Sequence, residues 1–214
     1  MKIGLISDTH GWIHPRLFDH FADCDEIWHA GDIGNVATAE KLSGFKSLKA
    51  VYGNIDDAMV RRIYPENLIF MAEGMRVRLT HIGGTPGHYD RRVLPELIEN
   101  PPDIFICGHS HIAKVMYDKK AGFLYINPGA AGYNGFHRYM TAIRFQIDGK
   151  NIHDLELIEL GERGRIIYPG HSGHRNYPQL YCPTFSADTC EAGPQQQSCI
   201  HKVLSRMNQD VSCH

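Results

Sequence analysis

The sequence lacks two features that would tie it to a membrane or to nucleic acid. It contains no apolar run near the roughly 20 residues that a membrane-spanning helix needs. Its 22 Lys and Arg residues nearly balance its 24 Asp and Glu residues, so the formal net charge is only -2. This balance gives no general electrostatic attraction to polyanions. We therefore expect neither a membrane nor a nucleic-acid polymer as a partner, and any phosphate binding must come from a local site.

Cysteine is scarce in the body of the chain. Only Cys24 and Cys107 fall within the first 160 residues, and each stands beside apolar sequence. The other four crowd into the last 33 residues without the CxxC spacing typical of zinc sites. Met1 and Lys2 lead directly into an apolar strand and not into the apolar segment of a signal peptide. These features favour free thiols and a cytoplasmic protein.

Apolar residues, by contrast, are plentiful. With 43% hydrophobic residues, a chain of 214 residues can bury a full core, and its length suits one domain with an extension. Strand-like and helix-like patterns alternate in the first third of the chain. Strands are expected at 3–6, 25–29 and 47–52, and helices at 15–22 and 36–42. This alternation favours parallel strands whose carboxyl ends share one edge of a sheet.

Beyond residue 67 the pattern becomes mostly antiparallel. Alternating apolar residues at 68–71 and 77–80 predict a hairpin that runs into His81, followed by a flexible loop at 82–88. A helix is expected at 89–99, with a buried face made of Val93, Leu94, Leu97 and Ile98. Further strands are expected at 103–107, 114–117, 124–126, 140–147 and 152–158. An α/β fold with two mixed sheets and outer helices uses these elements economically.

The last fifty residues have a different character. Beyond Gly161 the periodicity fails, and Pro, Gly, Ser, Gln and Cys replace the aliphatic runs. We therefore predict a domain at 1–162 and a poorly structured C-terminal extension at 163–214, in which only 200–207 could form a short helix.

Seven polar residues stand at the predicted strand ends or in the loops just beyond them. They are Asp8, His10, Asp32, Asn54, His81, His109 and His111. Carboxylate, imidazole and amide groups without a thiolate suit two borderline divalent ions such as Mn, Fe, Zn or Ni. Asp32 comes from the middle of the first three loops, so we expect its carboxylate to bridge the two ions.

In chain order these residues form the motifs Asp8-x-His10, Gly31-Asp32, Gly53-Asn54, His81 and Gly108-His109-x-His111. The ordered set resembles the signature of the calcineurin-like metallophosphoesterases. The short chain and the Asn127-Pro128-Gly129 loop are similar to those of the small bacterial and archaeal phosphodiesterases and of their eukaryotic relative, the retromer subunit of the same fold. The resemblance covers residues 1–160.

This resemblance implies a four-layer αββα sandwich of two mixed β-sheets flanked by helices. It also implies a dinuclear centre, with Mn as the first choice of metal. One ion would be held by Asp8, His10, Asp32 and His111, and the other by Asp32, Asn54, His81 and His109. A hydroxide bridging the two ions would attack the phosphorus of a small phosphoester directly, so no protein nucleophile is required.

One position departs from the wider family. Many members carry a histidine after the Gly-Asn pair, where it can stabilise the phosphoryl group or protonate the leaving oxygen, but here the residue is Ile55. This favours substrates whose leaving group needs little help, or a substitute proton donor. His88 in the loop and His137 are the two candidates.

Other polar residues near the motifs are expected to play structural roles. His29 is expected to support a ligand or to lie hydrogen-bonded in the core. Asp56 and Asp57 are interpreted as charges at a helix N-terminus. Paired arginines on helices usually face solvent, with guidance of a phosphate as the alternative, and this applies to Arg61, Arg62, Arg91 and Arg92.

Phosphodiester hydrolysis is the leading hypothesis, and two alternatives stay open. A phosphomonoesterase would use the same site, although Ile55 argues mildly against it. In the retromer subunit the same fold serves mainly as a binding scaffold, and fold alone does not separate these functions. The intact set of seven ligands favours the enzyme. The oligomeric state is left open, with a homo-oligomer as one alternative.

Overall fold

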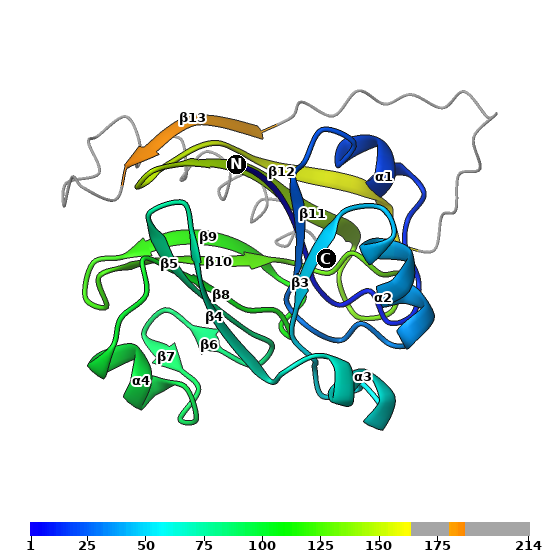
Figure 1. Cartoon of the computed structure of the whole chain (residues 1–214), viewed down its shortest axis with the longest axis horizontal. Helices are drawn as coiled ribbons and strands as arrows, with labels where there is room; N and C mark the ends of the chain where they lie inside the picture. Colours follow the sequence, from blue (N-terminus) through cyan, green and yellow to red (C-terminus); the bar gives the residue numbers. More distant parts are fainter. Residues whose placement is uncertain (164–179, 187–214) are drawn as a thin grey trace, which may run out of the picture.

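The structure is a computed structural model that describes residues 1–163 and the backbone of residues 180–186. Two mixed β-sheets lie at its centre, and the helices lie outside them (Figure 1). Sheet A has six strands in the order β13-β12-β11-β1-β2-β3. Their bounds are β1 (Lys2–Ile6), β2 (Glu26–His29), β3 (Ser47–Ala50), β11 (Tyr139–Asp148), β12 (Asn151–Glu162) and β13 (Leu180–Ser186).

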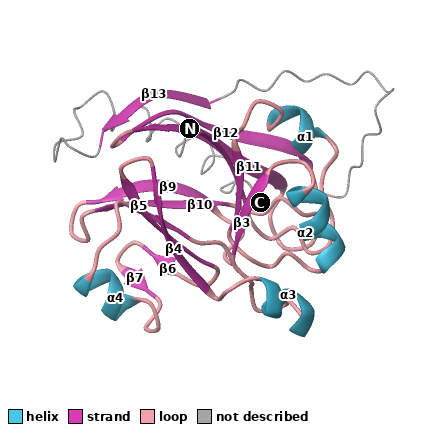
Figure 2. Cartoon of the chain, in the orientation of Figure 1, coloured by secondary structure: helices cyan, strands magenta, loops and turns pink. Residues whose placement is uncertain are grey.

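Sheet B has five strands in the order β4-β5-β8-β10-β9. Their bounds are β4 (Asn67–Ala72), β5 (Met75–Thr80), β8 (Ile104–Ile106), β9 (Ala113–Asp118) and β10 (Phe123–Pro128). A small hairpin, β6 (Gly84–Thr85) and β7 (His88–Tyr89), lies apart from both sheets. The helices (Figure 2) are α1 (Arg16–His20), α2 (Val36–Ser43), α3 (Ala58–Ile63) and α4 (Leu94–Glu99).

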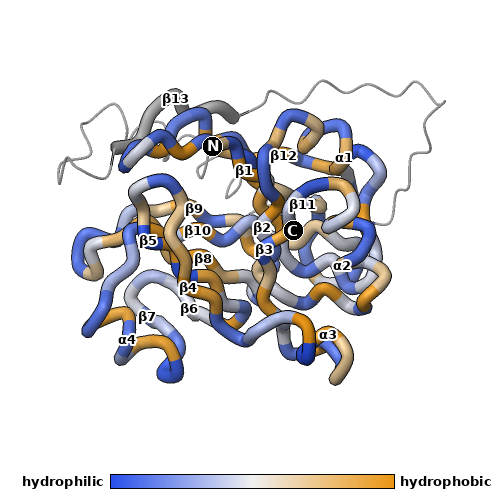
Figure 3. Tube along the Cα trace, in the orientation of Figure 1, coloured by the Kyte–Doolittle hydropathy of each residue, from blue (hydrophilic) through white to orange (hydrophobic). Residues whose placement is uncertain are grey.

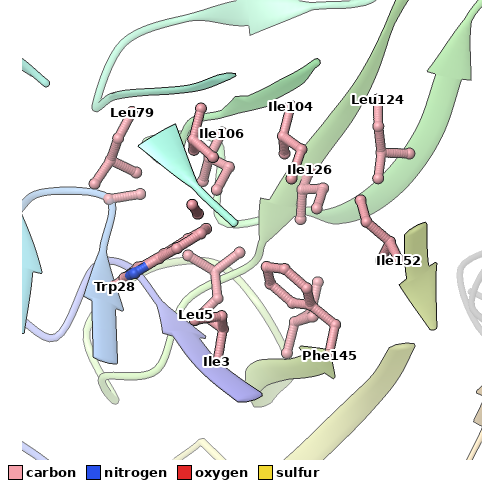
Figure 4. Packing of buried hydrophobic residues seen from close by; sticks show 14 of the residues in the cluster. Ile3, Leu5, Trp28, Leu79, Ile104, Ile106, Leu124, Ile126, Phe145 and Ile152 are labelled. Carbon is pink, nitrogen blue, oxygen red and sulfur yellow. The ribbon is translucent and has the colours of Figure 1, made fainter. Parts of the chain in front are cut away.

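The main core lies between the two sheets. Leu5 of β1 and Trp28 of β2 pack in one cluster with Ile104 of β8 and Ile126 of β10, and all four are buried (Figure 4). The apolar colour in Figure 3 follows these strands. Burying this much aliphatic and aromatic surface is the main driving force that holds the sheets together.

Helices cover the outer face of each sheet. Because side chains alternate along a strand, Ile6 of β1 points away from the main core and packs with Leu17 of α1 and Leu42 of α2. On the far side, Leu97 of α4 packs against Phe105 of β8. The four layers are therefore helices, sheet A, sheet B and helices, as the family resemblance implied.

Two local expectations between β5 and α4 are wrong. The segment expected as a flexible loop at 82–88 contains β6 and the start of β7, so His88 lies in a strand. The helix expected from residue 89 begins only at Leu94, where Pro95 suits a first helical turn. Ile98, placed by the pattern on the buried face, is 71% exposed, because this short helix buries Leu97 alone.

The C-terminal segment contributes one strand to sheet A. The backbone of β13 pairs antiparallel with β12 between Asn151 and Leu157. The helix predicted at 200–207 lies outside the described residues, and the division into a domain at 1–162 and an extension stays a prediction. Every helix in the described part of the chain is too short or too polar to span a lipid bilayer.

Candidate metal centre

Parallel strand pairing brings the predicted ligands to one edge of the fold. In sheet A, β1 pairs in parallel with β2, and β2 pairs in parallel with β3, so the loops that follow them start side by side. In sheet B, β5 and β8 also pair in parallel. The loops after these strands carry all seven predicted ligands.

The backbone of these loops is unusual for residues with a side chain. Left-handed φ angles occur at Asp8 (56°), His10 (50°), Asp32 (55°), His109 (67°) and His111 (58°). Such a conformation costs an L-residue about 1 to 2 kcal/mol, and strained residues of this kind cluster at functional sites. Backbone hydrogen bonds between neighbouring loops keep these residues in the strained conformation. Asp8 N donates to Gly31 O at 2.9 Å, and His10 N donates to Asp32 O at 3.0 Å.

Two of the glycines in the motifs are required by close approach. A Cβ atom on Gly53 would overlap the Asp32 carboxylate, and one on Gly108 would overlap the Ser7 hydroxyl and lie 2.9 Å from Asp8 Oδ2. The Gly-Asn and Gly-His motifs therefore reflect a steric need, because only glycine lets these loops lie against the neighbouring carboxylates.

The first group of ligands, called the Asp8 half below, consists of Asp8, His10 and His111. Asp8 Oδ1 lies 3.1 Å from His111 Nε2 and 3.9 Å from His10 Nε2. The two imidazole rings face each other with centroids 5.3 Å apart. These three side chains can offer one ligand atom each within 4.8 Å of one another.

The second group, called the Asp32 half below, is built around Asp32 and His81. His81 Nε2 lies 3.2 Å from Asp32 Oδ2 and 3.9 Å from Asp8 Oδ1. Asp32 Oδ2 also lies 3.4 Å from His10 Nε2. Both carboxylates thus contact histidines of both halves, and the assignment of the bridge to Asp32 stays a prediction.

Several buried atoms in this cluster have no hydrogen-bond partner. Asp8 Oδ1 and His81 Nε2 are buried and make no hydrogen bond, although His111 Nε2 lies 3.1 Å from the first and Asp32 Oδ2 lies 3.2 Å from the second. His81 Nδ1 lies 2.8 Å from Ala30 O, a pure acceptor, so Nδ1 carries a hydrogen, and in the neutral ring Nε2 presents a lone pair to the carboxylates. A carboxylate oxygen and an imidazole lone pair left bare in a buried site fit a cation, since burying them unpaired is otherwise costly.

The charges of the cluster reinforce one another. Burial alone would raise the pKa of Asp32, but its contacts with His10 and His81 outweigh burial and hold the pKa of this carboxyl well below its usual range. The contact with Asp32 is the main reason that the pKa of His10 is raised. The pKa of His81 is also raised, because the neighbouring carboxylates outweigh burial. The two carboxylates therefore draw positive charge into the site.

The two remaining predicted ligands lie at the margin of this cluster. His109 packs its ring 5.2 Å from that of His81, and burial lowers its pKa, which favours the neutral form that binds metals. Its backbone N donates to Asp8 Oδ2 at 3.1 Å. Asn54 is exposed and lines a pocket together with His81. All seven predicted ligands therefore lie in one region, with five of them in two close groups.

A model of the calcineurin-like phosphoesterase superfamily domain matches residues 1–150. The chain belongs to this superfamily. A probable metallophosphoesterase from Methanothermobacter thermautotrophicus is 30% identical over 171 residues, which are 75% of this chain and 94% of that protein. The family inferred from the motifs is thus confirmed.

Solved structures show the same superfamily fold. Vps29 from Chaetomium thermophilum is 17% identical with a TM-score of 0.66, over 87% of this chain and 98% of that one. A structure described as a novel archaeal phosphodiesterase is 21% identical with a TM-score of 0.55, over 74% of this chain and all of that one. At these identities the likeness shows the fold alone.

The two predicted proton donors of this superfamily member lie in different surroundings. His137 stands beside the Asp8 half, with its ring centroid 5.2 Å from that of His111. Its Nε2 lies 2.9 Å from Gly132 O, and its Nδ1 is buried without a hydrogen-bond partner. His88 is exposed in the β6-β7 hairpin and belongs to neither group. The structure therefore favours His137 of the two.

Two of the predicted supporting roles fit the structure. His29 is fully buried; its Nε2 lies 2.8 Å from Thr9 Oγ1, and Gly31 N donates to its Nδ1 at 3.1 Å. It therefore joins the loop after β1 to the loop after β2. Burial lowers the pKa of His29 to about 3, so the ring is neutral. Asp57 caps α3 by accepting from Met59 N and Val60 N.

Asp56 plays a role that the sequence did not reveal. The sequence predicts a charge at a helix N-terminus here, but the buried carboxylate accepts from the backbone N atoms of Ile33 (3.1 Å), Gly34 (2.6 Å) and Gly53 (2.8 Å). It thus ties the loop that carries Asp32 to the loop that carries Asn54. In the sequence Asp56 stands next to Asp57 and looks like a second capping residue. Only the fold of the loop shows that the two aspartates have different roles.

Other fixing contacts come from the loop backbone and from Asn127. Ile55 N donates to Asp32 Oδ1 at 3.0 Å, although the Ile55 side chain itself is 49% exposed. Asn127 is buried, and its amide donates to Gly108 O at 2.9 Å and to Ser110 Oγ at 3.1 Å. Asn127, expected in a loop, lies near the end of β10, where its side chain holds the segment that presents His109 and His111.

Proposed function

We propose that this chain is a metal-dependent phosphodiesterase that hydrolyses a small phosphoester. The observation that carries the proposal is the convergence of two buried carboxylates with three histidines, from four loops in all, leaving a carboxylate oxygen and an imidazole nitrogen without a hydrogen bond. A scaffold protein has no need for such a costly cluster. The likeness to a probable metallophosphoesterase and to an archaeal phosphodiesterase supports the proposal.

The proposed site holds two divalent ions, with Mn as the first choice and Fe, Zn or Ni as alternatives. Asp8, His10, Asp32 and His111 would hold one ion, and Asp32, Asn54, His81 and His109 would hold the other. When bound, such a pair of ions supplies an acidified water at neutral pH and neutralises the charge of the phosphoryl oxygens.

The proposed role of His137 is to deliver a proton to the leaving oxygen in place of the missing histidine at position 55. Gly132 O can only accept, so His137 Nε2 carries a hydrogen and Nδ1 is the atom that takes up and releases a second one. The ring contacts His111, a proposed ligand, and so lies at the edge of the centre. His88 is the weaker candidate because it is exposed in a hairpin away from both groups.

The test begins with protein stripped of metal and reconstituted with each divalent ion. We expect Mn to restore hydrolysis of bis-p-nitrophenyl phosphate, with elemental analysis finding two ions per chain. A faster rate with p-nitrophenyl phosphate would indicate a phosphomonoesterase instead. A folded protein that turns over neither ester with any divalent ion would point to the interaction scaffold.

His137 is tested with diesters of good and poor leaving groups. His137→Ala is expected to slow the poor leaving group by about 100-fold and the good one far less, since general acid catalysis contributes on this scale. His88→Ala serves as the comparison. An equal loss for both esters would remove His137 as the acid.

We also propose that the reaction takes place in the cytoplasm. The described cysteines, Cys24 and Cys107, are buried free thiols, which suits a reducing compartment. Association into a homo-oligomer stays an open prediction, to be settled by light scattering of the purified chain.

A further inference from the structure

A pocket opens directly beside Asn54 and His81 of the Asp32 half. Its volume is about 300 Å³, at the lower end of the range for small-ligand sites. Its wall is contributed by the loop after β3, by α3, by the facing ends of β4 and β5, and by the segment before α4. A substrate whose phosphoryl group sits at the metal ligands would place one of its alcohol groups here.

The wall is polar and carries both signs of charge. Besides the two ligands, the polar lining residues are Tyr52, Arg61, Glu66, Asn67, Thr80 and Arg92. Glu66 and Arg92 lie at its rim, with side chains 55% and 57% exposed and their nearest charged atoms 4.0 Å apart. An acceptor and a donor thus stand next to each other at the mouth. All four paired arginines are exposed, as expected, and two of them, Arg61 and Arg92, also line this pocket.

Arg61 and Arg92 already make hydrogen bonds within the chain, and these bonds weaken the attraction of both guanidinium groups for an anion. Arg92 Nε and Nη2 donate to the two oxygens of Asp90 at 2.8 and 3.2 Å, so the Asp90 carboxylate neutralises much of the charge of Arg92. Arg61 donates through Nε and Nη2 to the carbonyls of Asp56, Gly53 and Asn54. Its guanidinium also lies 4.8 Å above the ring of Tyr52, so Arg61 serves mainly to fix the Asn54 loop.

We propose that this pocket is the binding site for a neutral, hydroxyl-rich alcohol group of the substrate, such as a glyceryl or sugar group. The inference rests on the proposed phosphodiesterase function and names the substrate class of that site. Neighbouring hydroxyls can donate to Glu66 and accept from Arg92 at once, whereas a plain alkyl group can do neither. A second phosphate or carboxylate is disfavoured, because it has no hydrogen to offer Glu66 and is repelled by it.

The test compares two diesters that share the reacting phosphorus and the leaving group. Glyceryl p-nitrophenyl phosphate and propyl p-nitrophenyl phosphate differ only in their hydroxyls. With the metal-loaded full chain we expect kcat/KM about 10-fold higher for the glyceryl ester, the scale of one hydrogen bond to a charged group. A ribosyl ester of the same leaving group distinguishes a sugar from glycerol, and preference for either over propyl supports the proposal.

Variants tie the preference to the pocket. Glu66→Gln and Arg92→Ala should each bring the glyceryl-to-propyl ratio toward 1, and both side chains are exposed enough to be changed without loss of the fold. The matched controls are Glu99→Gln and Arg91→Ala, which change exposed residues of the same types that do not line the pocket. Both control variants should keep the glyceryl-to-propyl ratio of the unchanged chain.

Binding of the products gives a readout that does not depend on turnover. Calorimetry should find glycerol phosphate binding about 10-fold more tightly than propyl phosphate, and Glu66→Gln should remove the difference. Hydrolysis of both diesters at equal rates with equal product affinities would overturn the pocket inference and leave the proposed function standing. Absence of turnover together with selective binding of glycerol phosphate would overturn the proposed function and leave the pocket inference standing. Preference for a carboxyethyl ester over both would also overturn it, in favour of an anion site.

Discussion

The two halves of the metal centre are held in place by different means. In the Asp8 half, backbone bonds join the loop after β10 to the loop after β1, since Ala131 N donates to Ser7 O at 2.9 Å and Gly132 N donates to Asp8 O at 3.0 Å. In the Asp32 half, side-chain carboxylates of Asp56 and Asp32 accept the backbone N atoms of the neighbouring loops. The supports of the Asp32 half therefore depend more on side chains, whereas the Asp8 half combines these backbone bonds with the Asn127 amide, which holds the segment that carries His111.

The halves also differ in what lies around them. The Asp8 half has His137 against His111, and a Cβ on Gly135 would overlap the His111 ring, so this side is closely packed. The Asp32 half opens at Asn54 onto the polar pocket. Both halves reach the surface, since the His10 and His111 side chains are 14% and 17% exposed, but the polar pocket adjoins the Asp32 half.

Substitution of the metal ligands is expected to have the largest effect on activity, and the metal content of the variants should show whether the two halves bind their ions independently. Asp32 is the proposed bridge between the two ions, so Asp32→Asn should lower diester hydrolysis at least about 1,000-fold and remove most of both ions. His10→Ala and His81→Ala should each lower the metal content from two ions toward one. Elemental analysis of gel-filtered protein measures this. Loss of both ions in each histidine variant would show that the halves do not bind independently.

Removal of a supporting carboxylate should affect the Asp32 half next most strongly. Asp56→Ala leaves three backbone N–H groups without their acceptor and should lower the free energy of unfolding by about 3 kcal/mol. Its neighbour supplies the matched control, because Asp57→Ala removes only the cap of α3, at a cost of about 1 kcal/mol. Urea unfolding measures both. Equal losses would contradict the distinct role given to Asp56.

The last expected effect appears only in acid and concerns His29, which joins loops of the two halves. Its pKa is about 3 in the folded chain and about 6.5 when unfolded, so between these values the unfolded state binds the extra proton. Stability is therefore fully present above pH 6.5 and falls by up to about 1.4 kcal/mol per pH unit as the pH drops toward 3. His29→Gln should show a shallower acid slope in urea unfolding at pH 4 to 6. Identical slopes would show that His29 does not set the acid sensitivity.

Much of the site could be predicted from the sequence because its ligands are marked locally. Each stands just after a short apolar run, often beside a glycine, and parallel strands bring such positions together. The same logic failed for the segment from Ile82 to Ile98. There the apolar residues are few, and backbone pairing in a small hairpin decides the structure.

The sequence by itself determined the α/β class and, through the resemblance of its ordered motifs, the family and the layered fold that this family implies. Its alternating strands and helices also predicted that seven polar residues gather at one edge. Only the tertiary structure decided which of two adjacent aspartates caps a helix and which ties the loops. It also decided that Arg61 and Arg92 face a pocket. These roles depend on contacts between loops 20 or more residues apart, as between Asp56 and Ile33, and no local pattern encodes such contacts.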